Sequence, residues 1–322
     1  MLSAEFLSFE LYTIVTIASA SLFSVMFLFG SYVIFYKTPA TLKAYKFYFI
    51  YLHTAYQVTI FLVGFFGRVD VYFNASGAVC PTFFGIIQLF DRTAAYVEVA
   101  LAVFGLLNVG NAINLTFLYR YCHICRPNSF YATHQFWQKV IHIISSLVAS
   151  TIFAPLMLLG IISYAEERES GSEGGVAMCF TLNNMFYGSL ISIALYLCVT
   201  ASASCFFIYR VIRTLQTSLI QASAKTREMQ KALTITLLVF FAIPAAFGAV
   251  PVAGALYALL MRTAYIEIYF RFIFLACIWQ GPLTICATML LVKPYRHALL
   301  SFIRCNKKTI TLFKITRSTV LG

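Results

Sequence analysis

The feature that most constrains this chain is a series of long apolar segments separated by short polar stretches. A helix needs about 20 predominantly apolar residues to cross the hydrocarbon core of a bilayer. Seven segments reach that length, at about 11–36, 47–66, 93–118, 140–164, 181–209, 232–260 and 264–292. Lipid offers no partners for backbone amides and carbonyls, so each segment is expected to be helical. The pattern predicts an all-α membrane protein, a bundle of seven transmembrane helices.

Composition supports one integral domain over residues 1–305, followed by a basic tail over 306–322. The chain is 61% hydrophobic and 11% charged, which leaves too few charges to cover the surface of a soluble domain of this length. After the seventh span, Leu299, Phe302 and Ile303 recur at helical spacing between basic residues. This spacing predicts a short amphipathic helix over about 294–305, lying on the membrane surface. The apolar stretch 81–90 is too short to span, so it is expected to be a loop near the outer interface.

The cationic residues indicate which ends of the helices face the cytoplasm. The chain has 23 Lys and Arg against 11 Asp and Glu, a net charge of +12 that could suggest nucleic-acid binding. Most of the cations, however, fall in the first, third and fifth loops and after the seventh span. Cytoplasmic loops carry such an excess. The distribution therefore predicts that the N-terminus lies outside the cell. It also predicts that these charges contact membrane lipid and that the chain binds no nucleic acid. Acidic Glu5 and Glu10 before the first span favour an uncleaved helix over a signal peptide.

Two cysteines and one sequon fall in the predicted outer loops. Cys80 and Cys179 are expected to pair in that oxidising compartment, although two free thiols are the alternative. Asn74 begins an Asn-Ala-Ser sequon on the side where glycosylation takes place. Cys122 and Cys125 form a C-x-x-C pattern near an inner helix end, but a metal site needs further ligands, so neither a metal nor a cofactor is expected.

Several short motifs, in order along the chain, carry a resemblance to a known family. They are Tyr36-Lys37-Thr38-Pro39, Gln230-Lys231-Ala232-Leu233, Ala242-Ile243-Pro244, Gly281-Pro282-Leu283-Thr284 and Lys293-Pro294-Tyr295-Arg296. Over about 30–300 the chain resembles the class H (Srh) serpentine chemoreceptors of nematodes, in the Str superfamily. The resemblance implies a G-protein-coupled receptor in the plasma membrane of sensory cilia that detects a small molecule or peptide. The chain departs from the family pattern at Tyr119-Arg120-Tyr121, where the family tends to have Asn-Arg-Tyr.

A receptor of this kind needs a ligand pocket, and ionisable groups inside spans are the first candidates. Glu98 and Arg271 lie at similar depth near the outer ends of their helices, so they are expected either to pair with each other or to contact a polar ligand in the outer half of the bundle. The alternative is that each side chain reaches the headgroups without a function. Trp279 and Gln280 are further candidates for the pocket, with plain packing as the alternative. Asn108, Asn111 and Asn114 are spaced to hydrogen-bond neighbouring helices, which favours structural contacts over ligand binding.

The inner end carries the candidates for G-protein coupling. Arg120 resembles the family's inner arginine. Together with the loop cations Arg213, Lys225, Arg227 and Lys231, it is expected to form the docking surface for the G protein. The alternative is that these cations only set the orientation of the chain in the membrane and bind no partner. Pro244 interrupts the sixth span and is the candidate hinge, since proline removes a backbone hydrogen bond and kinks a helix. Cys305 is a candidate palmitoylation site.

Other function classes fit less well. A seven-helix ligand-gated ion channel subunit is the runner-up, but such subunits have the opposite topology. A transporter would show internal repeats, and an enzyme would show a cluster of catalytic groups; neither is evident in the sequence. The expected function is therefore a chemosensory receptor with two partners, an extracellular small molecule or peptide and a heterotrimeric G protein.

Overall fold

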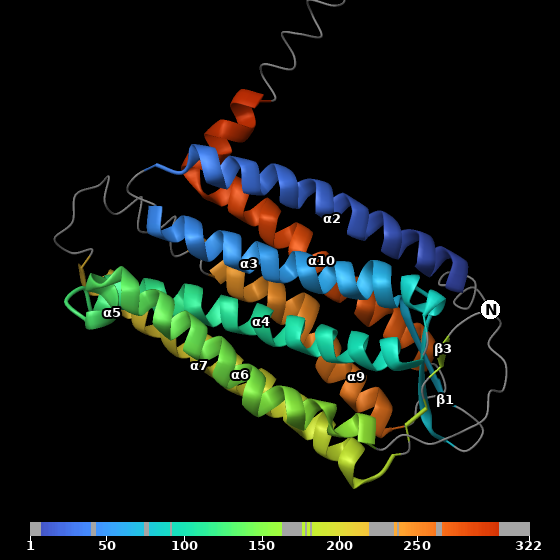
Figure 1. Ribbon diagram of the computed structural model, residues 1–322. Coiled ribbons are helices and arrows are strands. Elements are labelled where there is room, and N and C mark those ends of the chain that lie inside the picture. Colours follow the sequence, from blue (N-terminus) through green and yellow to red (C-terminus); the bar gives the residue numbers. More distant parts are fainter. Residues whose placement is uncertain are drawn as a thin grey trace, which may run out of the picture.

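The computed structural model is a bundle of long helices with a small sheet at one end (Figure 1). It describes residues 8–39, 43–73, 77–90, 92–162, 176–177, 179–180, 182–218, 235–236, 238–261 and 266–302. In that part of the chain, seven helices are long and apolar enough to cross a membrane. The predicted seven-helix fold is therefore confirmed.

The long helices follow one another in chain order with local breaks. They are α2 (Phe9–Lys37), α3 (Lys43–Phe61), α4 (Arg92–Cys125), α6 (Gln135–Ile162), α7 (Asn184–Ser218), α9 (Val250–Leu260) and α10 (Ile266–Leu291). The second span continues from α3 through η2 (Leu62–Gly67), and the sixth reaches α9 through a helical stretch that ends in η4 (Ala245–Ala249). α4 and α7 extend past their predicted inner ends at 118 and 209, because polar residues outside the lipid can remain helical.

Short polar side chains begin two of these helices. The Ser8 hydroxyl accepts from the Leu11 amide at the start of α2. Asn183 accepts from the amides of Met185 and Phe186 at the start of α7. Such caps satisfy amides that have no partner inside the helix.

A three-stranded antiparallel sheet, which was not predicted from the sequence, covers the outer end of the bundle. β1 (Val69–Phe73) pairs with β2 (Val79–Phe83), which pairs with β3 (Val176–Ala177). The stretch 81–90 was therefore wrongly predicted to be a loop: it contains the end of β2 and one helical turn, η3 (Ile86–Leu89). Val71, Val79 and Phe83 are buried against residues of α4, α7, α9 and α10. This apolar contact explains why the hairpin folds onto the helices.

The main core lies between α2, α3, α4 and α10, and α10 is the most buried of the spans. At the opposite end from the sheet, a short helix α5 (Phe130–Thr133) packs near the end of α4. A further helical segment at 293–302 follows α10 at an angle, near the end of α2 (Figure 1). Tyr295 anchors it, since its hydroxyl lies 2.8 Å from the Thr38 hydroxyl and its side chain is buried. The described part of this segment lies where the amphipathic helix was predicted.

Candidate ligand cavity and its links to the two faces

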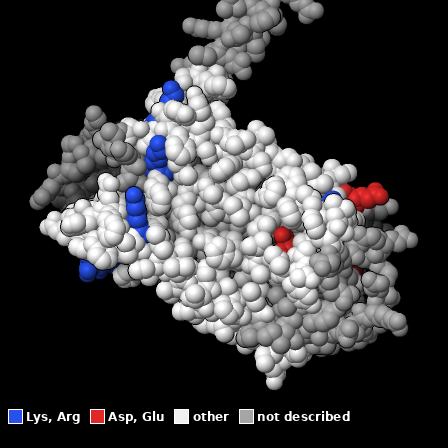
Figure 2. All heavy atoms as spheres, viewed as in Figure 1, with Lys and Arg blue, Asp and Glu red and all other residues white. Residues whose placement is uncertain are grey.

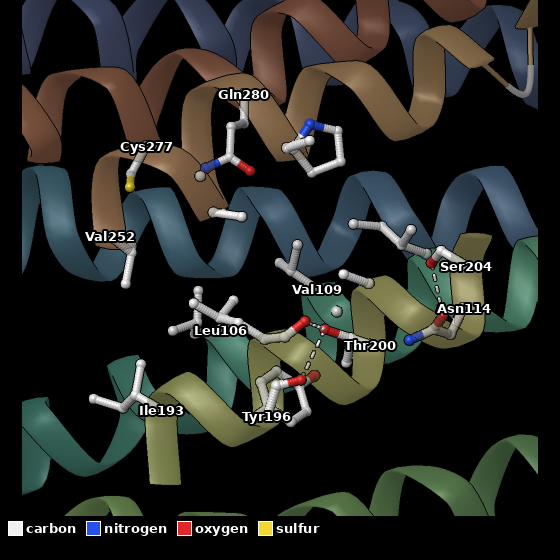
Figure 3. A pocket seen from close by; sticks show the side chains of 18 of the residues that line it. Leu106, Val109, Asn114, Ile193, Tyr196, Thr200, Ser204, Val252, Cys277 and Gln280 are labelled. Carbon is white, nitrogen blue, oxygen red and sulfur yellow. Dashed lines mark hydrogen bonds between the residues drawn. The ribbon is translucent and has the colours of Figure 1, made fainter. Parts of the chain in front are cut away.

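A cavity of about 130 Å³ lies between α4, α6, α7, the sixth span and α10. It is close to the middle of these helices, because its α4 residues run from Leu106 to Asn114 and its α7 residues from Ile193 to Ser204. Figure 3 shows side chains from α7 on one side of the space and Val252, Cys277 and Gln280 on the other. The cavity is therefore deeper than the outer-half pocket predicted from the sequence.

The cavity wall is apolar with a few polar groups on it. The Ser204 hydroxyl donates to the Asn114 side-chain oxygen at 2.8 Å. The Tyr196 hydroxyl donates to the Leu107 carbonyl at 2.8 Å, and the Thr200 hydroxyl donates to the Tyr196 carbonyl at 2.9 Å. All the residues that line this cavity are uncharged. It is therefore suited to a neutral guest.

The sixth span widens where it lines the cavity. The Val250 amide bonds the Ala245 carbonyl, five residues back, so η4 is a wide helical turn that directly follows Pro244. Wide turns of this kind occur often at functional sites, and they are one cause of helix kinks. Pro244, Ala245 and Gly248 all line the cavity. The proposed hinge and the cavity thus share one wall.

A glycine on the sixth span lets α10 approach closely at this point. A Cβ on Gly248 would lie 2.8 Å from the Gln280 amide nitrogen. That nitrogen donates to the Phe247 carbonyl at 3.1 Å, so the Gln280 side chain ties α10 to the wide turn. Of the four residues predicted to contact ligand, Gln280 alone lines this cavity. Trp279 lies outside its wall, with 38% of the residue exposed.

The suggested pairing of Glu98 with Arg271 is wrong. The Arg271 guanidinium instead forms a two-pronged ion pair with Asp70 of β1, with Nε–Oδ1 at 3.0 Å. Both side chains are nearly buried, and the Glu267 carboxylate lies 4.0 Å from the same guanidinium. Glu98 is buried beside Gly67. Their sequence positions predicted similar depths in the membrane. Depth alone, however, does not determine which neighbouring element each side chain faces. A ligand contact for either residue stays a prediction.

The three asparagines of α4 connect it to three different helices. Asn108 accepts from Tyr51 of α3 at 3.1 Å, Asn111 donates to Ser146 of α6 at 2.8 Å, and Asn114 accepts from Ser204 of α7. Residues three apart turn progressively around a helix, so each amide faces a different neighbour. These contacts support the structural role expected for them. Asn114 differs from the other two because it also lines the cavity.

The inner end contains a buried arginine rather than an exposed one. Arg120 is 1% exposed, and its guanidinium carbon lies 5.2 Å from the centre of the Tyr45 ring. It therefore offers no surface to a partner in this state, and its role in G-protein coupling stays a prediction. Arg213 is exposed near the inner end of α7. Lys225, Arg227 and Lys231 lie outside the described residues.

Aromatic side chains near this arginine link α3 to α4 and α5. The hydroxyls of Tyr48 and Tyr131 are 2.8 Å apart. Burial raises the pKa of Tyr131 to about 12, so this phenol stays protonated and able to donate at physiological pH. The Tyr48 ring also packs on Tyr119, next to Arg120, with ring centres 4.4 Å apart.

At the outer end, the structure contains the predicted disulfide between Cys80 and Cys179. It joins β2 to the residue before the Phe180 bridge, where Phe180 and Val79 exchange backbone hydrogen bonds. At the inner end, the Cys125 thiol contacts the Thr214 hydroxyl of α7 at 3.2 Å, a contact between helices. Asn74 and Cys305, the predicted modification sites, lie outside the described residues.

Comparison with known proteins agrees with this architecture. The model of a family described as serpentine type 7TM GPCR chemoreceptor Srh matches residues 3–305. No curated protein matches the sequence. The family match covers nearly the whole chain, and it confirms the resemblance carried by the motifs above. The chain belongs to the Srh family of serpentine seven-transmembrane G-protein-coupled chemoreceptors.

Proposed function

We propose that this chemoreceptor binds a small molecule in the midspan cavity and signals through a heterotrimeric G protein at its inner end. The observation that carries the proposal is the shared wall. The residues from Pro244 to Gly248 both line the cavity and form the wide turn of the sixth span. A ligand in the cavity would therefore touch the element best suited to change shape.

The other cavity walls belong to helices that reach the inner end. α4 leads from Asn114 to Arg120, and α7 leads from Ser204 to Arg213. A ligand shifts a conformational equilibrium only by binding one packing more tightly than the other. Contacts to three spans at once give it that opportunity, because a change in any of their relative positions alters the cavity.

The proposed response at the inner end is release of Arg120 together with movement of the sixth span. Arg120 is now covered by Tyr45 and its neighbours. Once exposed, it would join Arg213 and the loop cations Lys225, Arg227 and Lys231 in a cationic docking surface for the G protein. The family relationship supports placing the receptor in the plasma membrane of sensory cilia.

The test is a second-messenger assay in cells that express the full chain, with and without a G-protein blocker. Small molecules and peptides are screened, and surface expression is measured in parallel. A ligand-evoked signal that the blocker abolishes supports the proposal. A ligand-evoked current that persists under the blocker contradicts it and supports the channel alternative.

A further inference from the structure

We infer that the ligand of this cavity is a neutral, compact, mostly apolar molecule with one hydrogen-bond acceptor, and that Asn114 recognises this acceptor. The inference rests on the proposed function for the site, and it adds the chemical class of the ligand and the residue that selects it. Size, charge and hydrogen bonding are the three observations behind it.

Size sets the first limit. A dry cavity of about 150 Å³ in another protein holds benzene, and the cavity here is about 130 Å³. A guest of about six to eight non-hydrogen atoms fits this space. A peptide is too large to be held within it, which favours the small-molecule class of the two that the sequence left open.

Charge sets the second limit. The cavity wall consists of uncharged side chains such as Val109, Ile193 and Val252. The nearest ionic groups on the lining helices are about 9 Å along the helix axis from the cavity residues: Arg120 from Asn114 on α4, Arg210 from Ser204 on α7, and Arg271 from Cys277 on α10. Burying an ion without a partner costs far more than burying a neutral group. An ammonium, carboxylate or zwitterion is therefore excluded as a guest.

Hydrogen bonding sets the third limit. The hydroxyls on the α7 wall already donate to the protein: Tyr196 to the Leu107 carbonyl, Thr200 to the Tyr196 carbonyl and Ser204 to the Asn114 oxygen. With its oxygen held by Ser204, Asn114 keeps its amide nitrogen clear of that bond (Figure 3). Within the described part of the chain, no protein group accepts from this nitrogen. Facing these occupied hydroxyls, Asn114 of α4 offers a guest its amide nitrogen Nδ2, and the complement of this donor is an acceptor such as a ketone, ester or ether oxygen.

The experiment uses purified full-length receptor and four probes of similar shape. They are cyclohexanone, which only accepts hydrogen bonds; cyclohexanol, which accepts and donates; methylcyclohexane, which does neither; and cyclohexylammonium, which is charged. The midpoint of thermal unfolding is measured as a function of probe concentration for the wild type and two variants. Asn114→Leu removes the cavity amide, and Asn111→Leu removes a neighbouring amide that bonds Ser146 outside the cavity.

We expect cyclohexanone to stabilise the wild type at concentrations up to about tenfold lower than methylcyclohexane, since one hydrogen bond contributes up to about that factor. Cyclohexanol should bind no more tightly than cyclohexanone, and cyclohexylammonium should not stabilise the protein. Asn114→Leu should remove the advantage of cyclohexanone over methylcyclohexane, because the ketone oxygen then enters the cavity without this donor. Asn111→Leu should lower the melting temperature without probe yet keep the difference between the probes.

Three results would overturn the inference: stabilisation by cyclohexylammonium equal to that by cyclohexanone, equal effects of cyclohexanone and methylcyclohexane in the wild type, or no stabilisation by any neutral probe. The assay contains no G protein, so its outcome is independent of signalling. A receptor that signals to another compound but binds none of these probes would refute the ligand class alone. Binding without any signal in cells would refute the proposed function alone.

Discussion

The ion pair between Asp70 and Arg271 holds the outer sheet to α10, and it is nearly buried on both sides, at 13% and 12% side-chain exposure. Asp70→Ala removes the carboxylate that makes the two-pronged contact with the guanidinium, and breaking a buried pair in this way costs about 3–5 kcal/mol. We expect a matching loss of stability in thermal or denaturant unfolding of the purified receptor. Glu267→Ala is the control, because Glu267 is 52% exposed and exposed pairs contribute about 1 kcal/mol or less. Equal losses in the two variants would contradict this view of the pair.

Ser146 is the meeting point of three helices, and its neighbour Ser145 is not. The Ser146 hydroxyl lies 2.9 Å from the Tyr51 hydroxyl and accepts from Asn111 at 2.8 Å, whereas Ser145 donates to the His142 carbonyl on its own helix. Interhelical hydrogen bonds in membrane proteins contribute about 0.6 kcal/mol on average and up to about 1.7. Ser146→Ala should therefore destabilise the receptor by about 1 kcal/mol in the same unfolding assay. A loss of that size in Ser145→Ala instead would show that α4 is held in another way.

At this scale the sequence indicated which polar residues need partners but not which partners they have. A charged Arg271 inside a span must find a counter-charge, and the candidate chosen by depth was Glu98. The partner is Asp70, on a hairpin that was not predicted from the sequence. Sequence position gives height along a helix, whereas partner choice depends on rotation and on the fold of the connecting segments.

Among the elements, the sixth span carries the strongest prediction. Pro244→Ala restores a backbone donor and should favour a regular helix over the wide turn of η4. We expect a reduced maximal second-messenger response to ligand at equal surface expression. Pro155→Ala is the control, since Pro155 lies in α6 on an exposed face away from the cavity. An unchanged response in Pro244→Ala, or an equal loss in Pro155→Ala, would remove the hinge from the account.

The disulfide makes a second prediction at the element scale. Cys80 and Cys179 are 99 residues apart, and their bond closes a loop that includes α4 and α6. Removing a native disulfide costs about 2–4 kcal/mol. Cys80→Ser, Cys179→Ser and the double variant should lose the same stability, because each lacks the same bond. Cys198→Ser, at an exposed position of α7, is the control. A larger loss in the double variant than in either single one would show that the cysteines contribute separately.

The outer sheet shows where sequence reasoning on elements was insufficient. Hydropathy finds segments long enough to cross lipid, and all seven spans were predicted in this way. Strands as short as β1 and β2 give a weaker hydropathy signal than a membrane span does. The turn between them forms because the two strands pair, and segment length does not predict that pairing. The register that sets Tyr72 opposite Cys80 depends on packing against the bundle, which a single sequence does not encode in any local pattern.

For the whole molecule, the charges separate along the bundle axis. On the face shown in Figure 2, the cations gather toward the α5 end and the acidic groups toward the sheet end. This separation agrees with the orientation predicted from the loops, in which the sheet end faces outside. An epitope tag at the N-terminus should be detected on intact cells, and a tag at the C-terminus only after permeabilisation. The reverse pattern would contradict the orientation and favour the channel alternative.

The cavity could not be predicted from the sequence, because it arises from four spans and one residue of α6 that meet at mid-depth. Pro244 and Gln280 were singled out, the first as a hinge and the second as a pocket residue. Gly110 and Gly248 line the same cavity, but nothing in the sequence distinguished them from other glycines. Both permit close contacts between helices: a Cβ on Gly110 would collide with the Tyr196 hydroxyl. Small residues inside spans are a cue for close helix approach, but the space that remains depends on the packing of the whole bundle.

The measurement that tests the central claim most directly is the ligand dose-response of two tryptophan variants on adjacent positions of α9. Val252 points into the cavity (Figure 3), while Ala253 is exposed and lies outside its wall. At equal surface expression, Val252→Trp should abolish the blocker-sensitive second-messenger response by filling the cavity, and Ala253→Trp should retain it. A wild-type response in Val252→Trp would place ligand recognition elsewhere and contradict the account.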